Sequence, residues 1–87
     1  MAENALLIEI IPDDPDVNLD EILKKIQDTL PADVTLKDYK VEPFVFGLNK
    51  LKIMLIIPEK EGLTTEIEET INSIPGISAE ILSITRL

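Results

Sequence analysis

The sequence predicts an α+β fold, in which two helices cover one face of a four-stranded antiparallel sheet. Three observations lead to this prediction. The apolar pattern runs strand, helix, strand twice in succession, with proline or glycine at most boundaries. No low-complexity linker separates the two halves, and a length of 87 residues suits one domain. Two such units joined by one loop are typical of the ferredoxin-like βαββαβ sandwich, which we predict as a single domain over residues 1–87.

The first half is predicted to contain a strand, a helix and a weaker strand. Residues 5–11, ALLIEII, form a short apolar run before Pro12, and PDDPD at 12–16 is a turn. Asn18 is a helix cap, and Pro31 ends the helix. The apolar stripe of this helix has 3.6-residue spacing and comprises Leu19, Ile22, Leu23, Ile26 and Leu30. Within residues 34–42, Tyr39 and Val41 alternate with charged neighbours, which predicts a strand with one solvated face, ended or placed at an edge by Pro43.

The second half repeats the pattern with clearer signals. Residues 48–57 form a strand whose alternate positions are apolar, and Pro58 closes it. We expect Thr64 or Thr65 to cap the second helix, which Pro75 and Gly76 end. Its apolar stripe comprises Ile67, Ile71 and Ile74. Residues 77–87 are the last predicted strand. One face of the sheet is then left open to water or to a partner.

Composition excludes several kinds of chemistry. The chain has no cysteine and no histidine, which removes disulfides, thiol chemistry, the commonest metal ligand and the commonest general base. A net charge of −9 argues against nucleic acid, and no apolar run approaches the roughly 20 residues of a membrane span. Asp13, Asp14 and Asp16 lack the spacing of a calcium loop, and no phosphate-binding glycine motif is present. We therefore expect a cytoplasmic protein that is not an enzyme and has no metal, cofactor, nucleic-acid or membrane partner of its own.

Two features remain that point to binding. The only aromatic residues, Tyr39, Phe44 and Phe46, fall within eight consecutive positions around VEPFVFGLNKLK. The only arginine, Arg86, is the penultimate residue. A chain that otherwise builds its core from aliphatic residues has no evident packing reason to place its large rings together.

Several stretches together resemble a known family. They are PDVNLDEI at 15–22, EPFVFGLNKLKI at 42–53, GLTTEIEE at 62–69 and the final TRL. The chain is similar over essentially its whole length to the guanine-nucleotide exchange domain of archaeal translation elongation factor 1 beta and of its eukaryotic counterpart. The resemblance implies the ferredoxin-like fold, reached above from the pattern alone. It also implies a factor, expected to be monomeric, that speeds GDP release from the GTPase elongation factor 1 alpha in its GDP-bound or nucleotide-free form.

The resemblance assigns roles to particular residues. Phe46, before the loop glycine Gly47, matches an aromatic that inserts into the GTPase. Arg86 matches a basic residue that disturbs the Mg²⁺ and phosphate site, although the eukaryotic pattern has lysine there. Leu87 and Lys50 complete the predicted partner surface, and Asn49 departs from the lysine usual in eukaryotic members.

Other interpretations remain open for the sequence alone. Phe44 and Phe46 could plug one end of the sandwich, Tyr39 could pack in the core or at an edge, and Arg86 could be an ordinary strand end. Lys50 and Lys52 could be simple sheet-face charges. A small-molecule regulatory module of the same fold would want a glycine in the turn PDDPDVN, which has none. An acylphosphatase-like hydrolase would want an arginine near that turn, and the sole arginine lies at the other end of the chain.

Overall fold

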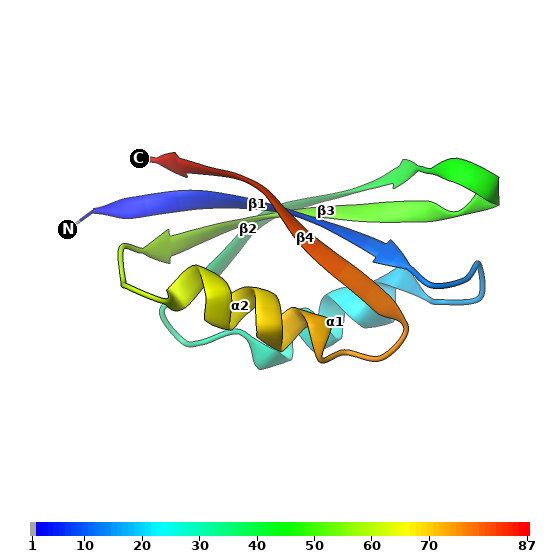
Figure 1. Ribbon diagram of the computed structural model, residues 1–87, viewed down its shortest axis with the longest axis horizontal. Helices are drawn as coiled ribbons and strands as arrows, with labels where there is room; N and C mark the ends of the chain where they lie inside the picture. The colour runs from blue at the N-terminus through cyan, green and yellow to red at the C-terminus, as the bar shows by residue number, and fades with distance from the viewer. Residues whose placement is uncertain (1) are drawn as a thin grey trace.

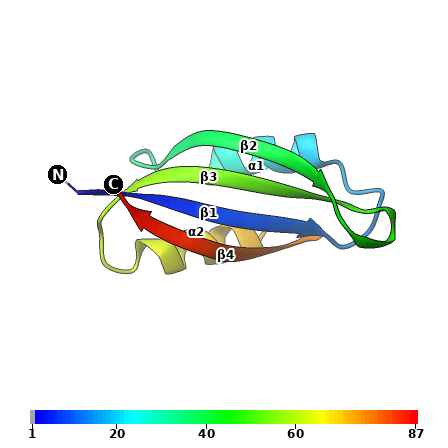
Figure 2. The same ribbon diagram turned by 90° about the horizontal axis from the view of Figure 1, so that it is seen from above.

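The computed structural model describes residues 2–87 and contains a four-stranded antiparallel sheet in the order β2-β3-β1-β4. The elements follow one another as β1 (Glu3–Pro12), α1 (Leu19–Thr29), β2 (Thr35–Pro43), a 3₁₀ turn η1 (Val45–Gly47), β3 (Asn49–Pro58), α2 (Leu63–Asn72) and β4 (Ile77–Arg86). Both helices cover the same face of the sheet, and the other face is open (Figures 1 and 2). The predicted ferredoxin-like sandwich is confirmed.

The core lies between the helices and the inner face of the sheet, and it is entirely aliphatic. Alternate residues of β1 and β3 point into it, while Ile67 and Ile71 of α2 are fully buried above them. No polar or charged residue of 2–87 is buried. Burial of each of these leucine or isoleucine side chains stabilises the folded state by about 1.5–3 kcal/mol relative to its exposure to water. The inward positions of the two central strands are Leu6, Ile8, Ile10, Leu51, Ile53, Leu55 and Ile57.

Helix α1 begins and packs as predicted. The side chain of Asn18 accepts hydrogen bonds from the backbone N–H groups of Asp20 (2.9 Å) and Glu21 (3.3 Å), which satisfies two otherwise unpaired donors. Ile22 and Ile26 of the predicted stripe are buried, and its leucines are partly buried around them.

The predicted cap of α2 is wrong. The helix begins at Leu63, so Thr64 and Thr65 lie inside its first turn, and Gly62 is the capping residue. Gly62 has a φ of 79°, a conformation that glycine adopts without strain and threonine does not. The tight turn after β3 therefore determines where α2 starts, and a threonine cap two or three residues later is not needed.

Two bulges in the edge strands were not anticipated. The register of β4 against β1 shifts at Leu82, and that of β2 against β3 shifts at Lys37. Each extra residue locally increases twist and bend. Beyond the bulge, every residue of the β4 end from Leu82 to Leu87 is exposed.

Candidate functional site

The turn between β2 and β3 presents Phe46 to solvent. Its main chain is closed by two hydrogen bonds, in which Phe44 N–H donates to Leu48 O (2.8 Å) and Leu48 N–H donates to Val45 O (3.1 Å). Phe46 has φ 56° and ψ 35°, and no other residue of 2–87 except glycine has a positive φ. Gly47 follows with φ 76°, and a Cβ there would meet no atom within 4 Å, so its role is conformational rather than spatial.

Phe46 gives the free chain no packing stability. Its side chain is 94% exposed. The left-handed conformation costs a residue other than glycine about 1–2 kcal/mol. The interpretation of Phe46 as a plug for the end of the sandwich is therefore wrong, because the ring touches no core. Backbone strain of this kind clusters at sites that bind other molecules.

Phe44 and Lys50 form the base of this hairpin. Phe44 is half-buried, and the ammonium of Lys50 lies 5.3 Å from the centre of its ring, within the range of a cation–π interaction. Lys50 Nζ also lies 2.7 Å from Oε1 of Glu9 on β1. The hydrogen bond to the Glu9 carboxylate raises the pKa of Lys50. Lys50 is thus held within the chain, and it ties the hairpin to a central strand.

Tyr39 and Val41 face the helix side of β2, opposite Ile53 and Leu51, yet they are 54% and 46% exposed. The exposure arises because β2 is an edge strand of the sheet that residues 2–87 form. Tyr39 therefore lies at the edge, as one interpretation held, and outside the core.

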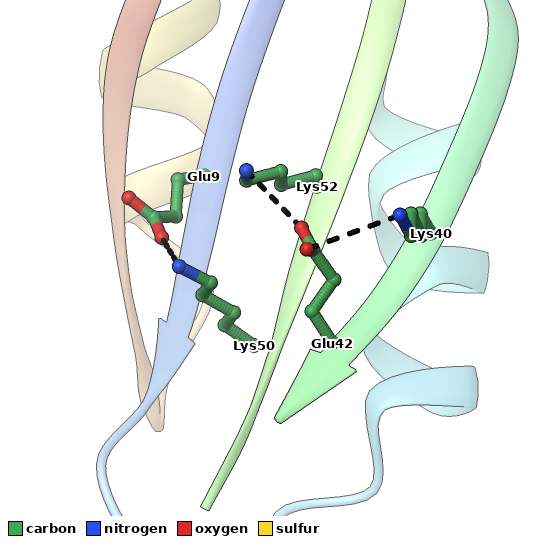
Figure 3. A network of polar contacts seen from close by, with 5 residues as sticks. All are labelled: Glu9, Lys40, Glu42, Lys50 and Lys52. Carbon is green, nitrogen blue, oxygen red and sulfur yellow. Dashed lines mark ion pairs between the residues drawn. The ribbon is translucent and has the colours of Figure 1, made fainter. Parts of the chain in front are cut away.

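The open face of the sheet carries a second ion-pair group beside Lys50 and Glu9 (Figure 3). Lys52 Nζ lies 3.1 Å from Oε1 of Glu42, and within residues 2–87 this oxygen has no partner besides Lys52. Lys40 Nζ lies 3.9 Å from the other carboxylate oxygen, Oε2. Contact with the Lys52 ammonium lowers the pKa of Glu42. Three cations and two carboxylates thus meet on one face of a strongly acidic chain. The remainder of that face has partly buried apolar residues, including Leu7, Met54 and Ile56.

Arg86 lies at the end of the edge strand β4, whereas Phe46 lies in a closed turn. Arg86 pairs with Asn4 in the β4–β1 ladder, and the next residue, Leu87, donates its N–H to Glu3 O at 2.9 Å. The Arg86 side chain is 72% exposed, and its guanidinium lies 3.2 Å from Oε2 of the half-exposed Glu59. An exposed ion pair of this kind stabilises a fold by about 1 kcal/mol at most. The main chain of Arg86 is therefore fixed while its charged tip remains available.

The structure does not bring Phe46 and Arg86 together. The β2–β3 hairpin and the C-terminus lie at opposite ends of a molecule 42 Å long (Figures 1 and 2). Asn49, beside the hairpin, and Ile57, in line with Arg86, are eight residues apart on β3. Eight steps of about 3.3 Å correspond to about 26 Å. Both ends lie on the sheet side of the molecule, away from the helices (Figure 1).

Comparison with known proteins shows which family this chain belongs to. The model of the EF-1 guanine nucleotide exchange domain matches residues 5–87. The chain belongs to this family. It is 38% identical over 89 residues to the elongation factor 1-beta of Hyperthermus butylicus, covering 100% of this chain and 97% of that protein. It is also 38% identical over 86 residues to the elongation factor 1-beta of Methanospirillum hungatei, covering 98% of each.

Solved structures match the exchange domain in fold. The ACT domain from the GTP pyrophosphokinase of Chlorobium tepidum has a TM-score of 0.62 and 15% identity, and the match covers 98% of this chain and 86% of that chain. An unknown protein from Galdieria sulphuraria has a TM-score of 0.61 and 12% identity, and the match covers 98% of this chain and 45% of that chain. At such low identity these likenesses show the shared fold alone.

Residues 2–87 contain neither a metal-binding cluster of acidic side chains nor a membrane-spanning helix. No group of three or more acidic side chains there is placed to hold a metal ion, and no helix is long and apolar enough to cross a membrane. In the β1–α1 turn, Asp16 N–H donates to Oδ1 of Asp14 at 2.8 Å, so this carboxylate stabilises the turn.

Sequence reasoning missed three features of the two ends of the exchange domain. Nothing in the letters VFG indicates that Phe46, rather than Gly47 alone, takes a left-handed conformation. The partner of Arg86, Glu59, directly follows β3 and is far from Arg86 in the sequence. The β4 bulge did have a signal, because the adjacent apolar pair Ile81 and Leu82 interrupts the alternation expected of a strand.

Proposed function

We propose that this exchange domain accelerates release of GDP from elongation factor 1 alpha by engaging the GTPase at two separated points. The observation that carries the proposal is Phe46, a large ring that is 94% exposed on a strained backbone in a chain whose family is defined by guanine nucleotide exchange. No covalent bond is made or broken. The factor changes only the relative affinities of the GTPase for nucleotide and for the factor itself.

Phe46 is the proposed anchor. A rigidly presented aromatic that fills a partner pocket carries much of the free energy of an interface. The closed turn and the positive φ of Phe46 and Gly47 fix the backbone, and with it the direction of the Cα–Cβ bond, before binding. Because the backbone is already ordered, binding costs only the rotation of the side chain about its own bonds.

Arg86 is the proposed effector. GDP is held in a GTPase largely through Mg²⁺ and through the backbone donors and lysine of the phosphate loop. A guanidinium brought to that region competes with Mg²⁺ for oxygen ligands and favours loss of the metal and then of the nucleotide. The exposed tip of Arg86 needs only to leave Glu59 to reach such a site, which costs little because the pair is exposed.

The separation of the two points requires a broad contact. A partner that touches both ends must span at least about 26 Å, the length of eight residues of strand from Asn49 to Ile57. Arg86 is in register with the buried Ile57, so its side chain leaves the helix-facing side of the sheet, and the partner reaches it along the β4 edge. Lys50 then acts as a support for the hairpin rather than as a free contact, because Glu9 and Phe44 already engage it. Leu87 adds an apolar contact next to Arg86.

The deciding experiment measures release of fluorescent GDP from the cognate GTPase, with the factor as a monomer in solution. The full chain should accelerate release strongly, and a polypeptide extension after Leu87 should abolish most of that acceleration by obstructing Arg86. If the untagged chain leaves the release rate unchanged, the proposed function is wrong. If the extended chain is fully active, the role of the chain end is wrong while the exchange activity stands.

A further inference from the structure

The two edge strands of the sheet differ in how well they are protected from pairing with another strand. Strands β2 and β4 are the edges. An exposed edge is a template for an added strand unless charge, proline or a bulge blocks it. Strand β2 carries all three devices, with a bulge at Lys37, four charged side chains, and Pro43 at its end. Strand β4 also has a bulge, at Leu82, but its ten residues contain no proline and only two charged side chains, Glu80 and Arg86.

The register shows which main-chain groups of β4 face outward. Leu87 N–H donates to Glu3 O, so residues 3 and 87 form a hydrogen-bonded pair. In an antiparallel ladder such pairs alternate with pairs whose N–H and C=O groups point away from each other. The next two pairs of this second kind, which are not hydrogen-bonded to each other, are Asn4 with Arg86 and Leu6 with Ile84. The N–H and C=O groups of Ile84 and Arg86 therefore point to the outer edge, where residues 2–87 form no further strand.

The same reasoning shows that β2 is poorer in donors. Phe44 N–H donates to Leu48 O, so the outward-facing residues of β2 near the hairpin are Pro43 and Val41. Pro43 has no N–H. At the β4 edge, by contrast, two successive outward positions keep both donor and acceptor, and exposed apolar side chains surround them. These side chains are Leu82, Ile84 and Leu87, at 42%, 52% and 65% exposure.

We propose that the free edge of β4 receives an extended segment of the GTPase as a fifth strand, hydrogen-bonded to the main chain of Ile84 and Arg86. This proposal rests on the proposed function. Pairing at Arg86 itself fixes the effector's backbone against the GTPase, so that its side chain starts from a defined position. The segment that fits is uncharged or basic and carries an apolar side chain to meet Leu82 and Ile84.

A second copy of this chain is the less favourable occupant. Pairing of two β4 edges would cover Arg86, the residue that the exchange reaction needs. It would also bring together two chains that each carry a net charge of −9. The edge is continuous with the chain end proposed to act on the nucleotide site, which favours the GTPase.

The test compares proline with alanine at one outward position on each edge. Ile84→Pro and Ile84→Ala both remove the exposed side chain, but only the proline variant removes the outward N–H, at a position where an edge strand tolerates it. Val41→Pro and Val41→Ala are the matched pair on β2. Affinity for nucleotide-free GTPase and the rate of GDP release are measured for all four full-length variants. Thermal unfolding establishes that each is folded.

The expected result is that Ile84→Pro binds about fivefold or more weakly than Ile84→Ala, the effect of one lost hydrogen bond. Val41→Pro should equal Val41→Ala within about twofold, and an Ile84→Pro variant that fails to fold is replaced by an N-methylated Ile84 made by ligation. Equal affinities of the two Ile84 variants would overturn the strand pairing, while strong exchange by the unaltered chain would leave the proposed function standing. A β4-dependent dimer of the free chain would also overturn it.

Discussion

The two ends of this exchange domain present large exposed side chains on opposite kinds of support. At the hairpin, two hydrogen bonds close a turn of five residues, an ion pair ties its base to β1, and the backbone of Phe46 is strained. At the chain end, Arg86 is the last residue of an edge strand, and its tip is held by one exposed ion pair. A stiff support suits an anchor that must not lose entropy on binding, whereas a loosely held tip suits a charge that has to move.

The largest effect on GDP release is expected when the charge of Arg86 at the chain end is removed. Arg86→Ala should reduce the maximal rate of stimulated GDP release on the order of a hundredfold, the effect of deleting one electrostatic group aimed at a reacting site. Arg86→Lys should retain part of the rate, because the charge remains while the planar fork is lost. Stopped-flow release at saturating factor measures both. A small effect of Arg86→Ala, with the fold intact, would remove Arg86 from the mechanism.

At the hairpin, replacing Phe46 is expected to weaken binding to the GTPase without lowering the stability of the fold. Phe46→Asn should weaken binding to the GTPase by about 2 kcal/mol, the usual loss at an interface hot spot. The free energy of unfolding should stay the same or rise by up to about 1 kcal/mol, because asparagine tolerates the left-handed conformation. Calorimetric binding and chemical denaturation measure the two quantities. Lost stability with unchanged affinity would return Phe46 to a structural role.

The support of the stiff end can be tested separately from the ring. Lys50→Met keeps the length of the side chain but removes the ion pair with Glu9 and the cation–π contact with Phe44. We expect a few-fold loss of affinity with no change in the maximal rate of release, because the hairpin becomes less ordered. Lys60→Met is the matched control, since Lys60 pairs with Asp33 at the other end of the molecule. Equal effects of the two variants would show that the hairpin has no special need of Lys50.

The ionised pairs also predict how stability depends on pH. Contact with Lys52 lowers the pKa of Glu42, and contact with Lys60 lowers that of Asp33. A carboxyl group with a lowered folded-state pKa stabilises the fold above its unfolded pKa of about 4, and that contribution is lost as pH falls through the folded value. Stability should therefore decrease below about pH 4. Glu42→Gln should flatten this decrease in thermal unfolding scans, and an unaltered profile would contradict it.

The smallest effect is expected from the residue that holds Arg86 in the free chain. Glu59→Gln removes one charge of an exposed pair, so stability should change by less than about 1 kcal/mol. The rate of GDP release should change by less than about twofold, because releasing Arg86 from Glu59 costs little. A large acceleration would instead show that Glu59 restrains the effector.

Sequence reasoning predicted the fold well because periodicity and boundary residues determine it locally. The aliphatic alternation of residues 48–57 and the Asn18 cap each had a single consistent interpretation. The cap of α2 was wrong because a glycine turn after β3, and not the threonines, determines where that helix begins. Phe46 and Arg86 could be chosen from their rarity and from the family resemblance. Their placement at opposite ends depends on strand register, which no local pattern contains.

The most direct test of two separate roles is the dependence of GDP release on factor concentration. Phe46→Ala and Arg86→Ala are compared with the unaltered chain over a range that reaches saturation. The structure predicts that Phe46→Ala shifts the half-saturating concentration upward and reaches nearly the same plateau, while Arg86→Ala keeps the half-saturating concentration and lowers the plateau. If both variants change midpoint and plateau alike, the hairpin and the chain end act as one unit, and the division between anchor and effector is wrong.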